Sequence, residues 1–570
     1  MWLVVALFAI LLTVKYFPGF EQSHPYSGNA FQVIHPDAFA GDPYKNPDKP
    51  ILKRPFQLSV LYALVKIGGE IWLDDRFVAV FYLGLVFAGL LGIDRIAVLL
   101  GITAPVERAL ILMLFLKDHA VLKNFVLLSH HPDVNHAALA IPVAVWLVYA
   151  ALARKGPVAI LALATLLVAI SVRSAVFPIL YALAVTAWQG TRNERLAVAG
   201  LFAGGLVVAY VGLFHLYPMA DAHRLQLWDL IKWAEGVTSD AFYADYGDHP
   251  AMLALRNVAW LCICAGALLT RVSRYPAFDG IRIIVVVALI VWLASSLYVK
   301  FAPDVMKMPL LLPLAAVRGL GLPQNLAYVA ITAGQLHRLR DDQNMRQLIL
   351  ASMAFAILMT LGPGNHALWV GLTAAGFAAA LLINYVRHHS IKPTEPAQFL
   401  VHAVGFVVAV SFATAAWQKA PAWKTCAATG VYGDSFSAKW IGVAEYVRAN
   451  TPKTASVLPL YDDPERGLWA SRTLGSRAGR AMPVPEHYGD LLNLDFWKFT
   501  DDQREQLKRV IAAFTERNLK RAAFEIDGLV PVPDYIVIPD HVLPTLEVPG
   551  FPYVVKTRIR GFAILKRRPV

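Results

Sequence analysis

The sequence contains little charge and little cysteine. Only 16% of its 570 residues are charged, whereas 57% are hydrophobic, and the mean hydropathy is +0.51. A composition this apolar excludes an ordinary soluble globule. The three cysteines, Cys262, Cys264 and Cys426, offer no disulfide framework and no metal-ligand spacing. Cysteine chemistry therefore gives no indication of function.

The sequence also lacks the common soluble-enzyme fingerprints. It has no glycine-rich nucleotide motif, and residues 417–570 contain no G-x-S-x-G turn, P-loop or CxxC pair. No basic stripe with interleaved aromatic residues accompanies the 52 Lys and Arg, which argues against a nucleic-acid partner. In an apolar chain such cations usually reflect membrane topology and lipid head groups.

Long hydrophobic runs are what the sequence has instead. Many are close to 20 residues, the length that crosses a bilayer as a helix. The pattern predicts a polytopic α-helical membrane protein with about thirteen transmembrane helices in residues 1–416. The first run lacks a basic n-region and an A-x-A site, which predicts a retained anchor. The expected spans lie near residues 2–17, 77–93, 109 onward, 137–153, 157–172, 174–188, 196–216, 252–269, 281–298, 322–336, 348–361, 367–385 and 399–416.

The distribution of basic residues predicts an orientation. Connections such as 154–155, 192–195 and 271–282 are rich in Arg and Lys, which places them and the N-terminus in the cytoplasm. An odd number of spans then puts residues 417–570 outside. Compact loops and the absence of paired cysteines fit a bacterial inner (plasma) membrane, with a periplasmic C-terminal domain.

Residues 417–570 differ in character from the rest. They are polar and rich in strand and turn signals, which predicts a mixed α/β or α+β domain. The expected strands are 455–460, 535–539 and 553–556, and the expected helices are 437–450 and 501–519.

The first polar loop, residues 18–54, holds the main catalytic candidates. It contains His35-Pro-Asp-Ala-Phe-Ala-Gly-Asp-Pro-Tyr44 and precedes a predicted interfacial helix at 55–75. Asp37 and Asp42 lie five positions apart in a turn-rich segment, so both can converge on one site as general base or metal ligand. The alternative is that each carboxylate only caps a turn beside its neighbouring proline.

This loop motif resembles first-loop motifs of the GT-C superfamily, integral-membrane glycosyltransferases that use polyprenyl-phosphate sugars. The stretches Asn450-Thr-Pro-Lys-Thr-Ala-Ser-Val-Leu-Pro459 and Gly479-Arg480-Ala-Met-Pro-Val-Pro485 also look like the outer domain of such proteins. The resemblance implies a GT-C-like fold, an acidic catalytic residue in the first loop, a lipid-linked sugar donor and an inverting transfer. It leaves open a divalent metal ion, which many members use and others do not need.

A second group of candidates lies in the loop 117–136. His130, His131 and Asp133 are candidate metal ligands, although no strict ligand spacing such as H-E-x-x-H is present. Asp118 and His119 are candidates for acceptor binding. The alternative is a polar interface loop whose histidines are solvated or bonded to nearby backbone.

The remaining candidates follow from the expected topology. Arg173, Lys307 and Arg318 fall on its outer side, where a cation can bind a lipid-linked phosphate or can simply extend toward head groups. The segment 303–309, which contains Lys307, has two prolines, as in broken segments that line cavities. His366, in a Gly-Pro-Gly-Asn-His turn, is a further candidate.

The sequence therefore favours a membrane glycosyltransferase that moves a sugar from a polyprenyl-phosphate donor to a lipid, glycan or protein acceptor. An O-antigen ligase or polymerase is a second enzyme hypothesis, but such enzymes usually lack a mixed C-terminal domain of this size. A transporter or flippase of lipid-linked precursors is the rival from another class, and it requires buried polar groups and broken helices within the bundle. A membrane scaffold whose outer domain binds a partner also remains open.

Overall fold

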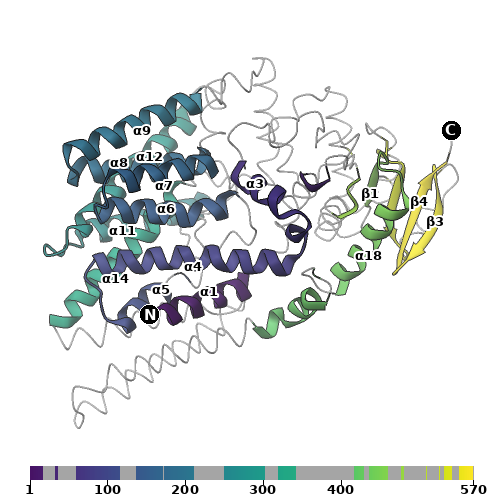
Figure 1. The fold of residues 1–570 in the computed structure, drawn as a ribbon, viewed down its shortest axis with the longest axis horizontal. Helices are drawn as coiled ribbons and strands as arrows, with labels where there is room; N and C mark the ends of the chain where they lie inside the picture. The colour runs from purple at the N-terminus through teal and green to yellow at the C-terminus, as the bar shows by residue number, and fades with distance from the viewer. Residues whose placement is uncertain are drawn as a thin grey trace, which may run out of the picture.

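The computed structural model describes residues 1–16, 33–35, 59–113, 115, 136–170, 172–210, 250–301, 319–341, 416–428, 430, 435–459, 477–480, 509, 521, 525–526, 532–541 and 551–568. These residues form a helical bundle and, beyond it, a smaller domain that contains a sheet (Figure 1). The bundle comprises α1 Trp2–Tyr16, α3 Ser59–Gly68, η2 Gly69–Leu73, α4 Asp75–Leu99, α5 Pro105–Met113, α6 His136–Leu152, α7 Pro157–Ile170, α8 Val172–Gln189, α9 Arg192–Tyr210, α11 Pro250–Leu269, α12 Ala277–Phe301 and α14 Gly321–Asp341.

Helix α4 organises the bundle. It packs against α1 on one side and α6 on the other, and α7, α8 and α9 follow α6 as antiparallel neighbours (Figure 1). Gly92 allows α4 and α6 to approach closely, because a Cβ there would lie 2.7 Å from Val145 Cγ1. The indole of Trp146 then donates to the Ala88 carbonyl oxygen at 3.0 Å. Close backbone approach and one partly buried hydrogen bond therefore fix this helix pair.

The helix ends far from the sheet domain are tied together. His337 of α14 contacts the carbonyl oxygen of Leu100 at 2.7 Å and stacks on Tyr275 with ring centroids 5.0 Å apart. Gln189, which ends α8, donates to the carbonyl of Pro276 at 2.9 Å. Leu152, which ends α6, fills the space over Gly280 near the start of α12. The connections α6–α7, α8–α9 and α11–α12 thus meet at one end of the bundle.

A buried ion pair joins α4 to α5. Arg108 Nε donates to Asp94 Oδ1 at 2.6 Å, and a second guanidinium nitrogen bonds the other carboxylate oxygen. The Asp94 side chain is only 1% exposed and that of Arg108 14%. A bidentate pair with this geometry satisfies both charges, and it holds the nine-residue α5 against the bundle.

The prediction of about thirteen transmembrane helices in a GT-C-like fold is wrong. Of the residues that the structure describes, two helices are long and apolar enough to cross a membrane, α4 over Asp75–Leu99 and α12 over Ala277–Ser295. The expected spans 77–93 and 281–298 lie in these two helices. Those at 348–361, 367–385 and 399–416 lie outside the described residues.

Most of the other described helices are shorter or carry more polar groups. Helices α1, α6 and α7 have 15, 17 and 14 residues. At 1.5 Å per residue the longest of these reaches about 26 Å, less than a 30 Å hydrocarbon core. Helix α9 opens on Arg192, Glu194 and Arg195, and α14 carries Gln324 and His337. Apolar composition alone therefore overestimated the number of spans.

The predicted interfacial helix is divided into two pieces. The described part consists of α3 and the 3-10 helix η2, which meet at Gly69, where a φ of +58° favours glycine. Leu61 and Val65 are buried, whereas Ile67 is 85% exposed. Trp72 of η2 donates to the Leu64 carbonyl at 3.0 Å and so folds the second piece back onto the first.

The C-terminal domain is a mixed sheet with a helix on one face. The strands β1 Val457–Pro459, β2 Tyr535–Pro539, β4 Phe562–Arg567 and β3 Tyr553–Ile559 lie side by side in that order. The β1–β2 pair is parallel and the other two pairs are antiparallel. Helix α18, Ser435–Asn450, packs Trp440 and Val447 against Phe562 and Val537. The predicted strands and the helix at 437–450 are confirmed, β4 was missed, and 501–519 lies almost wholly outside the described residues.

Replacing Asp94 with Asn should destabilise the bundle by about 3 kcal/mol, because the buried Arg108 charge loses its partner. The double variant Asp94→Leu/Arg108→Met should recover most of that loss, since it buries apolar groups in place of a charge pair. Thermal unfolding of the purified full chain measures both. A single variant as stable as the unaltered chain would contradict the structural role of the pair.

Candidate functional site

One cluster of charged side chains lies where the bundle meets the C-terminal domain. We call residues 59–76, which comprise α3, η2 and the start of α4, the corner (Figure 1). Asp74 is the N-cap of α4 and accepts from the backbone N–H of Arg76 at 2.8 Å, as short polar residues do at helix starts. The Arg76 guanidinium also binds both carboxylate oxygens of Asp74.

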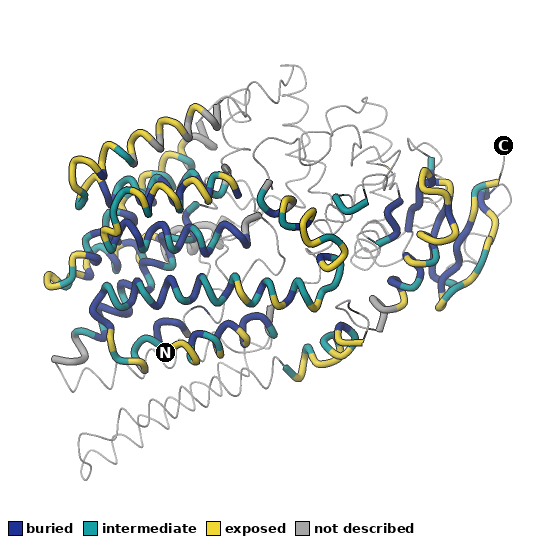
Figure 2. The backbone as a smooth tube through the Cα atoms, in the orientation of Figure 1, coloured by how far each residue is buried: buried dark blue, intermediate teal, exposed yellow. Residues whose placement is uncertain are grey.

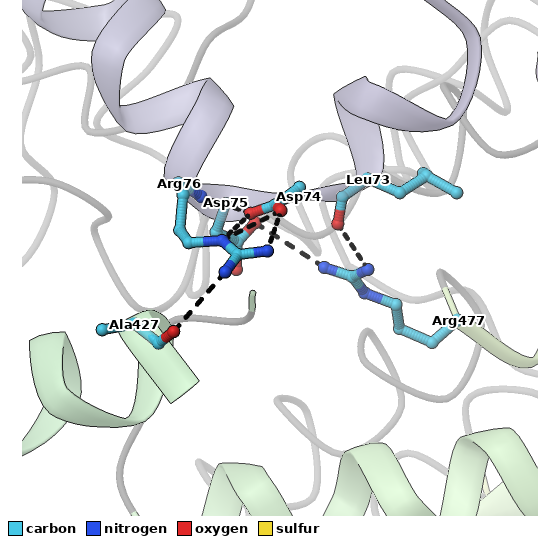
Figure 3. A network of polar contacts seen from close by, with 6 residues as sticks. All are labelled: Leu73, Asp74, Asp75, Arg76, Ala427 and Arg477. Atoms are coloured by element: carbon cyan, nitrogen blue, oxygen red, sulfur yellow. Dashed lines mark hydrogen bonds and ion pairs between the residues drawn. The ribbon is translucent and has the colours of Figure 1, made fainter. Parts of the chain in front are cut away.

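The C-terminal half of the chain contacts the corner through the Arg477 side chain and the carbonyl groups of Ala427 and Gly430, the first two of which are drawn in Figure 3. Arg477 Nη1 donates to the Leu73 carbonyl at 2.6 Å, and its Nη2 lies 3.6 Å from Asp75 Oδ1. The Asp75 backbone N–H donates to the carbonyl of Gly430 at 2.8 Å. Arg76 reaches the Ala427 carbonyl at 3.5 Å. Arg477 and Asp75 are mostly buried, so this pair is a true domain contact.

Gly430 is required at the close approach. Its φ is +69°, and its N–H bonds the Cys426 carbonyl to end the helical residues 416–428. A Cβ at this position would lie 3.3 Å from the Asp74 carboxylate carbon. Both the conformation and the available space therefore favour glycine.

The electrostatics of the contact follow from these partners. Hydrogen bonds from the Arg76 side chain hold the pKa of Asp74 below its ordinary value, against the opposite effect of partial burial. Burial, together with the negative charges of Asp75 and Asp74, raises the pKa of the Cys426 thiol to about 12. Cys426 is therefore a neutral packing residue and not a nucleophile at neutral pH.

His35 makes the second contact between the corner and the domain. Its Nε2 lies 2.7 Å from Glu70 of η2 and 3.3 Å from an Arg448 nitrogen of α18. A protonated Nε2 donates to Glu70, whereas a neutral ring with its proton on Nδ1 accepts from Arg448. His35 thus lies between two groups of opposite charge at the point where the His-Pro-Asp loop begins.

Arg480, part of the motif that resembles a glycosyltransferase outer domain, has a structural role. Its guanidinium donates to the carbonyl oxygens of Arg448 at 2.6 Å and Thr451 at 2.8 Å. It also bonds the carbonyl of Ala478 and the hydroxyl of Thr451. These contacts satisfy the end of α18, so Arg480 is occupied in holding this helix and not offered to a ligand.

The residues predicted from sequence are not brought together by the described part of the structure. Arg173 is the second residue of α8, and its side chain is not described. The other candidates lie outside the described residues: Asp37, Asp42, Asp118, His119, His130, His131, Asp133, Lys307, Arg318 and His366. Among the described residues no group of three His, Cys, Asp or Glu side chains is placed to hold a metal ion.

Sequence reasoning missed the corner itself. The local signal was present in Asp74-Asp75-Arg76, a charged triplet directly before an apolar run, and His35 stood inside the quoted loop motif. The partners gave no signal, because Arg477 lies 404 residues from Leu73 and Arg448 lies 413 residues from His35.

The sequence matches no protein-family model and no curated protein. The arrangement of the described residues is therefore the basis on which function is inferred.

Changing Arg477 to Met should release the C-terminal domain from the corner. A hydrogen bond that involves a charged group contributes about 1.5–3 kcal/mol, so the undocked population should rise at least about tenfold. Thermolysin should then cleave near residues 416–428 faster by a similar factor. Arg509→Met, which removes an exposed ion pair with Glu525, is the matched control and should change cleavage little. Equal cleavage of the two variants would contradict the docking role.

Acid should weaken the same contact through Asp74. Its folded-state pKa lies below the ordinary 3.8, so its ionised form stabilises the fold above that value, and this stabilisation disappears as pH falls through the lower pKa. Asp74→Asn keeps a good N-cap but removes the charge. Thermal midpoints measured between about pH 5 and pH 3 should therefore fall less steeply for the variant. If the thermal midpoints of the variant and the unaltered chain fall equally steeply with pH, this role of Asp74 is excluded.

Proposed function

We propose that the chain is a membrane glycosyltransferase that moves a sugar from a polyprenyl-phosphate donor to a lipid, glycan or protein acceptor. The observation that carries the proposal is the contact of His35 with Glu70 and Arg448. It fixes the start of the acidic loop at the meeting point of apolar bundle, corner and C-terminal domain. Asp37 follows His35 by two positions in the sequence.

The exposed surface of the bundle supports a membrane location. Large apolar side chains lie outward on one stripe of α12, which comprises Val286, Ile290, Leu293 and Leu297. Helices α1 and α7 carry similar outward residues, and the outer faces of the helices remain exposed in Figure 2. Water does not favour exposed apolar surface of this extent, whereas acyl chains do. We therefore place the bundle in a bacterial inner membrane, with the C-terminal domain in the periplasm.

The proposed chemistry assigns roles to the residues predicted from sequence. The carboxylate of Asp37 or Asp42 takes the proton of the acceptor hydroxyl, and the hydroxyl oxygen of the acceptor forms a bond to the anomeric carbon of the donor sugar. The bond from that carbon to the phosphate oxygen breaks, and the configuration inverts. Arg173, Lys307 and Arg318 stabilise the charge of the departing polyprenyl phosphate.

The remaining groups position the reactants. Asp118, His119 and His366 bind the acceptor or donor sugar, and His130, His131 and Asp133 are the ligands if a divalent ion takes part. The C-terminal domain, held on the corner by Arg477, recognises the acceptor or covers the site. Its position beside His35 suits either task.

One observation favours a transporter of lipid-linked precursors as the second candidate. Asp94 and Arg108 form a buried charge pair inside the bundle, and α5, with nine residues, is a short helix of the kind found in transporters. The pair is closed on itself, however, which suits a structural role better than a transport path. We therefore rank transport second.

The test is transfer from a radiolabelled polyprenyl-phosphate sugar by the purified full chain. Asp37→Asn, Asp42→Asn or both should lower the rate at least about 100-fold, the usual contribution of a general base. Asp279→Asn, a carboxylate in an exposed i,i+3 pair with Arg282, is the matched control and should retain full activity. The catalytic assignment fails if neither loop variant lowers transfer, and the function fails if the unaltered chain transfers no lipid-linked sugar.

A further inference from the structure

The end of the bundle opposite the corner carries exposed basic residues on three separate connections. We call this surface the basic end, and it comprises Arg154, Lys155, Arg192, Arg195, Arg271 and Arg274. The contacts of Gln189 with Pro276 and of Leu152 with Gly280 bring the three connections together. Six cations from three connections that are far apart in sequence thus form one charged end of the bundle.

The acidic residues described near these cations are already engaged. Glu194 is buried and accepts from the backbone N–H of Thr191 at 2.7 Å in a capping box. Asp279 pairs with Arg282 at 3.2 Å. Asp94 is buried with Arg108. Within the described residues the exposed charge of this end is therefore predominantly positive.

Large apolar side chains stand exposed directly beside the cations. Val158 is 78% exposed three residues after Lys155, and Leu269 is 80% exposed two residues before Arg271. Trp188 is 70% exposed just before the α8–α9 connection. Each basic connection therefore has an apolar neighbour on the adjacent helix wall, and a tryptophan is a typical anchor at a membrane interface.

We propose that the basic end binds anionic phospholipid head groups of one membrane leaflet, with the adjacent apolar side chains among the acyl chains. A nucleic acid or a free phosphate would use the cations but would leave Val158, Leu269 and Trp188 in water. A phospholipid contacts both kinds of surface at once. The inference rests on the membrane location proposed above and is independent of the transfer chemistry.

The proposal gives the bundle an orientation. The cytoplasmic leaflet holds the anionic lipids and attracts basic segments close to its surface. The basic end then faces the cytoplasm, and the corner and the C-terminal domain face the opposite side. Lipid binding at one end thereby keeps the His35 contact on the periplasmic side.

The experiment measures binding of acyl-labelled phosphatidylglycerol to the detergent-solubilised full chain by fluorescence anisotropy. Phosphatidylcholine with the same label should bind at least about tenfold more weakly, since each basic residue near an anionic surface contributes about fivefold. Arg192→Gln/Arg195→Gln should weaken phosphatidylglycerol binding about 25-fold on the same basis. Lys439→Gln/Lys566→Gln, two exposed cations of the C-terminal domain, is the matched control and should bind normally.

Three outcomes would overturn the proposal. They are equal binding of the two lipids, equal effects of the two double variants, and displacement of the lipid by free glycerol 3-phosphate at similar concentrations, which would indicate recognition of phosphate alone. The assay needs no sugar donor. Lipid binding without transfer would therefore refute only the proposed function, and transfer without preference for phosphatidylglycerol would refute only the lipid site.

Discussion

The arrangement of the two domains depends on the contacts that the guanidinium of Arg477 makes with the corner. The guanidinium donates to the carbonyl of Leu73, the last residue of η2, at 2.6 Å. It also lies 3.6 Å from the carboxylate of Asp75, the first residue of α4. Helix α4 packs against both α6 and α1, so a group bound to its first residue is bound to the centre of the bundle. One mostly buried cation thereby positions the C-terminal domain.

The charged groups that join the corner to the C-terminal domain are of both signs. The side chains of Glu70, Asp74 and Asp75 and those of Arg76, Arg448 and Arg477 all take part in ion pairs or charge-assisted hydrogen bonds. Such a set favours docking over capture of an anionic substrate, because the cations already have partners. His35 differs, since its Nε2 is shared between Glu70 and Arg448. The proposed catalytic loop therefore starts from a site that the docked domain helps to hold.

The sequence predicted the positions of individual helices and strands well, but it predicted the lengths of the helices poorly. The apolar stretch 77–93 between charged ends defined α4, and a dense apolar pattern defined β2 at 535–539. The predicted helix lengths were wrong because short apolar helices, such as the 14-residue α7, are stabilised by packing against their neighbours. Amino-acid composition does not show such packing. The corner was beyond sequence reasoning, since no local pattern links Leu73 to a residue 404 positions away. The candidate residues Asp37 and Asp42 stay predictions.

The most direct test is the distance distribution between spin labels on α3 and α18, measured by pulsed electron paramagnetic resonance. Ile67 and Lys439 are exposed and suit labelling through cysteine, in a full chain whose three native cysteines are replaced by alanine. We expect one narrow distribution, which broadens when Arg477 is also changed to Met. A broad distribution with Arg477 in place would contradict it, because the corner and the C-terminal domain would then not form one unit.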